Sequence, residues 1–292
     1  MVRYFVASVQ VLVLCVISLA SNLAVAEPQN KPVRMGIISL ASPATTFKQW
    51  QSFADYLGQH LNREIEIVVP KGFKKIQQSV VEQSVDIFFI NSYIFYQLKQ
   101  QGLVKALAQM ENTSGSVLSH SVMFVRSDSG IETIEDMRGQ KVAFVSPVGA
   151  GGYLAPRATL YKKGVKTSAQ TDEEFTGNLS SSIHKVLLGD VKLGTMCEIN
   201  YKLMSQRVNT GDIKIIAESE KYPEALFGTR IDLPEKLQQR ITSIMLAMSN
   251  DKDGLKILKS LSVLKIKKFV PYDENIERLT KKLIKMAEFT NK

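Results

Sequence analysis

A glycine-rich stretch, SPVGAGGYLAP at residues 146–156, has the composition of an anion-binding turn. It follows an apolar run typical of a strand, KVAFV at residues 141–145, and precedes a run typical of a helix. Backbone N–H groups at the start of a helix have no intrahelical partners, and the helix dipole makes that end positive. The stretch therefore predicts a backbone that faces an anion.

Side chains that could perform catalysis or hold a metal are few and scattered. Cys197 is the single cysteine after residue 26, and His60, His120 and His184 lie far apart, so no spacing typical of a zinc site occurs. A cysteine nucleophile needs a nearby base, and the nearest histidine, His184, precedes the strand that ends in Cys197. The sequence also contains no Gly-x-Ser-x-Gly elbow, P-loop or dinucleotide-binding glycine pattern. We expect no catalytic residue, no metal and no cofactor.

Further polar residues follow the predicted strands, where open α/β sheets bind ligands. They are Ser39 and Ser42 after the first strand, Asn91, Ser92 and Tyr93 after the run DIFFI, Ser121 at the start of the strand-like run SVMFV, and Gly177 and Asn178 before a helix. Each of these positions also suits a cap or a turn, which is the purely structural alternative.

Two series of alternating strands and helices position these residues. The first has strands at 33–40, 65–69 and 85–90 with helices at 45–61 and 74–83 between them, an order that implies parallel strands with right-handed crossovers. The second series covers residues 121–219, and helices dominate from residue 235 onward. We expect an α/β protein with two lobes around a cleft, in which the C-terminal helices pack on the first lobe.

The N-terminus has the features of a cleaved secretory signal. Arg3 precedes the apolar run VLVLCVISLA, and Ala24-Val25-Ala26 has the form of a cleavage site. We therefore expect residues 1–26 to be a signal peptide and the mature chain to be exported. The net charge of +9 is compatible with an anionic ligand, but the lysines are dispersed, and no nucleic-acid motif is present.

Several blocks together resemble the periplasmic phosphonate- and phosphite-binding proteins of ABC transporters. The blocks are GIIS with FKQWQSFADYLGQHL, VDIFFINSYIFYQL, SVMFVRSDSGIETIEDMRGQKVAF, GGYLAPRATLYKKG and LLGDVKLGT. The resemblance implies a two-lobed type II periplasmic binding protein with mixed, mostly parallel sheets flanked by helices. Lobe 1 would comprise residues 27–122 and, after a return, 223–292, and lobe 2 residues 123–222.

The ligand site departs from the pattern of this family at three places. The family's Ser-Thr-Ser triplet corresponds to Gly149-Ala150-Gly151, followed by Gly152 and Tyr153, and its anion-contacting histidine falls at about Leu179. The family's polar pair after the next strand aligns with Met196, Cys197 and Glu198. Each lost hydrogen bond to an ionic ligand costs about 1.5–3 kcal/mol. We expect weak phosphonate binding, and a carboxylate, a softer or larger oxyanion, or a ligand with an apolar body instead. The glycines would make room for ligand atoms.

The resemblance implies a solute-binding protein that captures a small anionic ligand by hinge motion and presents it to an ABC permease. Its ligand contacts would be the strand-end residues above, the stretch from Gly149 to Tyr153, Cys197 and Glu198. The alternative is a periplasmic sensor for a histidine kinase, with a thiophilic oxyanion bound through Cys197. A buried, inert thiol is the other interpretation of Cys197.

Overall fold

The computed structural model describes residues 31–38, 42–167 and 172–288, and the chain from Val33 onward forms one compact unit. The predicted signal peptide and Ser39 lie outside the described residues. Among those that are described, no helix has both the length and the apolar character needed to cross a bilayer.

The first sheet has six strands in the order β13-β4-β12-β3-β1-β2. Their bounds are β1 Val33–Ile37, β2 Ile65–Val68, β3 Ile87–Ile90, β4 Val104–Asn112, β12 Leu226–Arg230 and β13 Ile266–Val270. β1 pairs in parallel with β2 and β3, as the predicted order requires. β12 enters from later in the chain and runs antiparallel between β3 and β4. Sequence periodicity did not predict β4.

Helix α2 shows why the first crossover forms where it does. α2 spans Pro43–Leu61; the Ser42 hydroxyl accepts a hydrogen bond from the Thr45 N–H at its start, and Asn62 ends it in the left-handed conformation. Its apolar stripe buries Trp50 and Phe53, whereas Phe47 is 46% exposed. α3 (Phe73–Val81) and α4 (Ser92–Gln100) follow β2 and β3.

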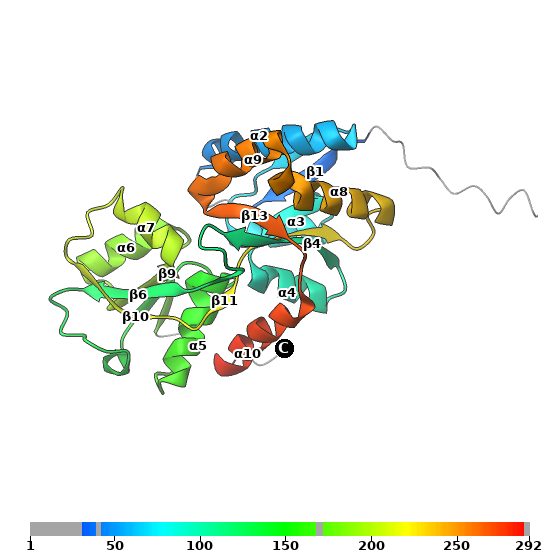
Figure 1. The fold of residues 1–292 in the computed structure, drawn as a ribbon. Coiled ribbons are helices and arrows are strands. Elements are labelled where there is room, and N and C mark those ends of the chain that lie inside the picture. The colour runs from blue at the N-terminus through cyan, green and yellow to red at the C-terminus, as the bar shows by residue number, and fades with distance from the viewer. Residues whose placement is uncertain (1–30, 39–41, 168–171, 289–292) are drawn as a thin grey trace, which may run out of the picture. The chain divides into compact units, whose positions relative to one another are not determined.

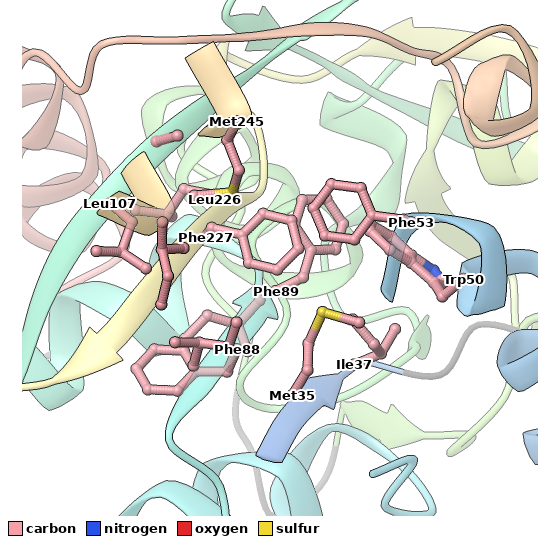
Figure 2. Close-up of a cluster of buried hydrophobic side chains, with 14 of the residues drawn as sticks. Met35, Ile37, Trp50, Phe53, Phe88, Phe89, Leu107, Leu226, Phe227 and Met245 are labelled. Carbon is pink, nitrogen blue, oxygen red and sulfur yellow. The ribbon is translucent and has the colours of Figure 1, made fainter. Parts of the chain in front are cut away.

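The core of the first sheet is a cluster of aromatic and aliphatic side chains between β-strands and α2 (Figure 2). Phe53 of α2 stacks on Phe227 of β12 with ring centroids 5.2 Å apart, and Trp50 lies 4.9 Å from Phe89 of β3. Full burial of such a side chain stabilises the fold by about 1.5–3 kcal/mol. This packing holds Trp50 and Phe89 in place at one end of the first sheet.

The second sheet has five strands in the order β10-β6-β9-β7-β8. The bounds are β6 Ser121–Arg126, β7 Val142–Phe144, β8 Glu173–Phe175, β9 Leu193–Cys197 and β10 Ile213–Glu218. β7 pairs in parallel with β8 and β9, and β6 runs antiparallel to β9 and β10. The flanking helices are α5 Ala155–Lys162, α6 Leu179–Leu188 and α7 Glu198–Ser205. Between β6 and β7 the chain forms a 3₁₀ turn, Glu135–Met137.

Two chain segments connect the sheets, and they pair with each other. β5 (Leu118–Ser119) lies on the first connection and β11 (Tyr222–Pro223) on the second, and the two form a short antiparallel ladder. The predicted lobe boundaries at residues 122 and 222 lie at these connections and stay a prediction.

The C-terminal helices divide between two environments (Figure 1). α8 (Glu235–Ala247) and α9 (Lys252–Leu261) pack against α2, as expected. α10 (Glu277–Met286) instead contacts both α4 and α5, which flank different sheets. Leu283 of α10 and the following Ala287 pack with Ala155 and Ala158 of α5. α10 therefore packs on α4 and also covers α5 with its apolar face, and the assignment of residues 223–292 to lobe 1 stays a prediction.

Candidate ligand-binding cavity

A cavity of about 190 Å³ lies where elements of the two sheets meet. The first sheet and its helices contribute one part of the lining: Ile38, Thr45, Thr46, Gln49, Trp50, Phe73, Phe89, Asn91, Met110 and Leu264. The second sheet contributes Val145, Gly149–Gly152, Leu179, Met196, Cys197, Ile199, Asn200, Leu203, Met204 and Arg207. The connections add Ser119 and Tyr222–Ala225.

The glycine-rich turn forms one wall of this cavity through Gly149, Ala150, Gly151 and Gly152. Its first helical turn is a π-helix, Ala150–Leu154, in which the Leu154 N–H donates to the Gly149 carbonyl. Pro156 explains the wide turn, because it has no N–H to donate to the Gly152 carbonyl. That carbonyl accepts instead from the Val145 N–H at 3.2 Å and from Thr195 Oγ1 at 3.2 Å. The start of the helix is therefore anchored to the sheet.

Tyr153, expected at the ligand, is not among the lining residues. Its hydroxyl donates to Glu173 Oε2 at 2.9 Å and accepts from Arg157 at 2.6 Å. Its ring packs edge-on against Phe144 and Phe175. Arg157 and Glu173 form a buried ion pair, and Tyr153 ties the helix to β8 through that pair. The structure therefore places Tyr153 in the hydrophobic core of the second sheet.

Gly151 lines the cavity, but the volume that its side chain would occupy is filled. The Tyr222 ring and the Cys197 Cβ occupy the volume in which a side chain at position 151 would stand. Gly151 is glycine because a residue from the second connection fills its place.

Of the three residues after β3, Asn91 alone lines the cavity. Asn91 caps α4 by accepting from the Tyr93 and Ile94 N–H groups, and its amide donates to the Val148 carbonyl at 3.2 Å. The Ser92 hydroxyl donates to the Pro223 carbonyl at 2.7 Å, which fixes the second connection. Tyr93 is buried against Ala150 and its neighbours, behind the cavity wall.

The remaining predicted polar residues lie outside the lining. Ser42 is an exposed helix cap, and the buried Ser121 hydroxyl donates to the Gly151 carbonyl at 2.5 Å. Asn178 caps α6 from an exposed position directly after Gly177. Glu198 pairs with Lys202 one turn along α7. These residues support the fold around the cavity.

Cys197 lines the cavity at the start of α7. Burial raises the pKa of its thiol to about 12, although hydrogen bonds from Asn200 oppose the shift. Asn200 is 6% exposed and also lines the cavity, and its Oδ1 has no hydrogen-bond partner. An unpaired buried amide oxygen costs about 1–3 kcal/mol, so Asn200 presents an unused polar group to whatever fills the cavity.

Glu224 places a carboxyl group at the cavity from the second connection. It accepts from Asn112 Nδ2 at 3.0 Å. Burial raises its pKa, and the hydrogen bonds from Asn112 and Ser119 and the nearby His120 reduce that rise. Among the described lining residues, the basic side chain is that of Arg207, which is exposed. The interior of the cavity therefore contains no buried cation among its described residues.

Leu179, the position aligned with the family's histidine, does line the cavity, and it is an apolar residue at the start of α6. His184 is exposed and lies close to the Ser180 hydroxyl. In the described ranges, no three His, Cys, Asp or Glu side chains cluster in a way that could hold a metal ion.

Sequence reasoning missed much of the lining, including Trp50, Asn200, Tyr222 and Glu224. On α7 a signal was present: Asn200, Leu203, Met204 and Arg207 recur at the spacing of one helix face. For Tyr222 and Glu224 no local pattern exists, because they come from an irregular connection.

The comparison that decides the family is a match over most of the chain. A model of the family described as "ABC transporter, phosphonate, periplasmic substrate-binding protein" matches residues 35–275. The chain belongs to this family. Proteins of this family are periplasmic substrate-binding proteins.

The relatives found by sequence include both a sensor kinase and an import protein. The Tetrathionate sensor histidine kinase TtrS of Salmonella typhimurium is 30% identical over 147 residues, which are 49% of this chain and 25% of the kinase. The chain thus matches about a quarter of the length of that relative. The Phosphate-import protein PhnD of Mycolicibacterium smegmatis is 23% identical over 262 residues, 82% of this chain and 81% of the relative.

Solved structures show the periplasmic binding protein fold. A binding protein component of an ABC phosphonate transporter from Pseudomonas aeruginosa superimposes with a TM-score of 0.75 at 18% identity, and the match covers 88% of each chain.

Proposed function

We propose that this protein is a periplasmic solute-binding protein whose ligand is a small, soft oxyanion, with a sulfur oxyanion as the best fit, and that it binds this ligand without transforming it. The observation that carries the proposal is the composition of the cavity. A helix start without hydroxyl side chains forms one wall. The others combine aromatic, aliphatic, thioether and thiol groups with a few polar residues, among them Asn200 and Glu224.

The helix start supplies the attraction for negative charge. Backbone N–H groups and the helix dipole favour an anion there by about 0.3–2 kcal/mol for the dipole alone. With Gly149, Ala150 and Gly151 in place of hydroxyl residues, this wall cannot replace the full hydration shell of a phosphonate dianion, and uncompensated burial of charge is costly. A weakly hydrated anion loses less on entering such a site.

The other walls would make favourable contacts with a polarisable part of the ligand. Met110, Met196, Met204 and Cys197 place sulfur atoms around the cavity, beside the rings of Trp50 and Phe89. Thioethers adapt to irregular shapes and make favourable dispersion contacts. Tetrathionate, the anion for which the related sensor kinase is named, is a chain of sulfur atoms with a sulfonate at each end. One sulfonate at the helix start and the sulfur chain along the methionines would use both parts of the cavity.

The membrane partner follows from the family. A substrate-binding protein of an ABC transporter delivers its ligand to a permease after the lobes close around it, and we propose this role first. The second candidate is a sensing role with a histidine kinase, which the 30% identity with the tetrathionate sensor favours. Cys197 would contact the ligand as a neutral thiol in either role, because its raised pKa opposes thiolate chemistry.

The test is a ligand panel with the purified protein. Thermal shift followed by calorimetry would compare tetrathionate, thiosulfate, methylphosphonate, phosphite, phosphate and small carboxylates. A ligand at 100 times its Kd stabilises the protein by about 2.7 kcal/mol. We expect stabilisation by a sulfur oxyanion. Tight binding of methylphosphonate, with no response to sulfur oxyanions, would overturn the proposal.

A matched pair of variants connects binding to the cavity. Asn200→Ala removes a side-chain amide that lines the cavity, and we expect the affinity for an oxyanion to fall by about 1.5–3 kcal/mol, because the Nδ2 group can donate a hydrogen bond to a charged ligand. The exposed Asn250 is the control, and Asn250→Ala should leave affinity unchanged. Equal affinity of both variants would place the ligand elsewhere.

A further inference from the structure

The volume beside Gly151 is filled from a distant part of the chain. A Cβ at Gly151 would lie 2.1 Å from Tyr222 Oη, 2.6 Å from Tyr222 Cζ and 2.9 Å from Cys197 Cβ. Carbon atoms do not approach so closely, so any side chain at position 151 requires Tyr222 to leave. Gly149 is different, because the nearest atom to its Cβ would be the Ser146 carbonyl oxygen at 3.3 Å. A side chain at position 151 and the phenol of Tyr222 are therefore mutually exclusive.

Tyr222 is held in this place by both connections between the sheets. It lies on β11, opposite Ser119 of β5, and is 5% exposed. Its hydroxyl donates to the His120 carbonyl at 3.4 Å. Ser121, on the same connection, donates to the Gly151 carbonyl. The turn and the two connections thus meet at Gly151, and the phenol is a fixed part of the cavity wall.

We propose that Tyr222 is a specificity-determining residue of the cleft, because its phenol group replaces the side chain of position 151 as the wall beside the helix start. This inference rests on the proposed function in that the cavity must be the ligand site. With the phenol in place, the turn cannot carry a hydroxyl at position 151, and a compact tetrahedral oxyanion cannot be enclosed by side-chain donors from the turn. The turn then offers an anion its backbone N–H groups alone, beside the apolar residues of the lining.

The proposal predicts that specificity changes only when both positions change. We would compare Gly151→Ser, Tyr222→Ala and the double variant, with Gly149→Ser as the matched control that adds a hydroxyl to the same turn without meeting Tyr222. Gly151→Ser should lower the Tm more than Gly149→Ser does, and Tyr222→Ala should suppress that loss, which is non-additive behaviour typical of residues in contact.

Calorimetry with methylphosphonate and tetrathionate supplies the specificity readout. The double variant should gain at least tenfold in affinity for methylphosphonate relative to the wild type, whereas Tyr222→Ala alone should not. Tyr222→Phe, which retains the ring, should keep the wild-type ranking of the two probes. An unchanged ranking in the double variant, or additive effects on the Tm, would overturn the proposal.

The outcomes separate this inference from the proposed function. If the wild type binds no sulfur oxyanion, the proposed ligand class is wrong, but a gain of methylphosphonate binding in the double variant still supports the role of Tyr222. If the wild type binds tetrathionate and the double variant retains the same ranking, the proposed function stands and the role of Tyr222 is rejected.

Discussion

Individual residues at the cavity have their chemistry set by two opposing effects, burial and local hydrogen bonds. Cys197 begins α7, where a helix start ordinarily lowers the pKa of a thiol. Burial is the larger effect here and raises that pKa to about 12. Glu224 follows the same pattern, since desolvation outweighs the hydrogen bonds that favour its charged form. Burial therefore keeps the Cys197 thiol neutral and shifts the Glu224 carboxyl toward its neutral form.

The raised pKa of Cys197 predicts a thiol of low reactivity. With a pKa of about 12, roughly one molecule in 10⁴ carries a thiolate at pH 8, compared with about a quarter for an ordinary cysteine thiol. Alkylation of the folded protein by iodoacetamide should therefore be about 10³-fold slower than alkylation of the urea-unfolded chain. Mass spectrometry measures both rates, and Cys197→Ser identifies the modified site. Equal rates in the two states would contradict the assignment.

At the scale of elements, the asparagine residues that cap helices on the two sides of the cavity make different hydrogen bonds. Asn91 caps α4 and also donates to the Val148 carbonyl, on the turn that follows the second sheet's β7. Asn178 caps α6 and has no comparable hydrogen bond across to the first sheet among the described contacts.

The π-helix at Ala150–Leu154 also has a local cause. Pro156 makes the turn wide, and the Gly152 carbonyl is then free to accept hydrogen bonds that anchor the helix on the sheet.

Removal of the two caps should therefore have unequal effects. Asn178→Ala should lower the free energy of unfolding by about 1 kcal/mol, the value of a helix cap. Asn91→Ala should lower it by about 2 kcal/mol, since the hydrogen bond to Val148 is lost as well. Urea titration measures both values. We also expect ligand affinity to fall for Asn91→Ala alone, and equal losses of stability and affinity would show that the contact with Val148 contributes nothing.

At the scale of the whole folded unit, the connections between the sheets form a buried polar cluster beside the cavity. Asn112 at the end of β4 donates to the Leu118 carbonyl and to Glu224, and so joins both connections. Gln109 donates to the Glu224 and Ala225 carbonyls. The titratable groups around the Glu224 carboxyl are His120, Cys197 and Tyr222. The charge of Glu224 therefore affects both segments that connect the sheets.

The raised pKa of Glu224 predicts how stability changes with pH. The folded protein retains the proton of Glu224 at pH values where the unfolded chain, with a carboxyl pKa of about 4.3, has lost it. The folded state then binds more protons, so this group's contribution to stability decreases as the pH rises above that unfolded value. Glu224→Gln should flatten the decrease of Tm with pH in this range and raise the Tm at pH 7 relative to the wild type.

Glu64→Gln, on an exposed side chain, is the control and should leave the pH profile unchanged. The profile is measured by calorimetry in buffers of constant ionic strength. A Glu224→Gln profile parallel to that of the wild type would show that Glu224 does not hold its proton in the fold.

The sequence by itself determined the local features of this protein. Apolar periodicity predicted the parallel β1, β2 and β3 with their crossovers, and the glycine-rich turn predicted a helix start, because these signals depend on neighbouring residues. Turn glycines, however, have the same local signature whether they admit a ligand or another side chain. Only the tertiary structure placed Tyr222 beside Gly151 and Glu224 beside Asn112. Contacts between segments far apart in the chain are set by packing, and packing decided which chemistry the cavity presents.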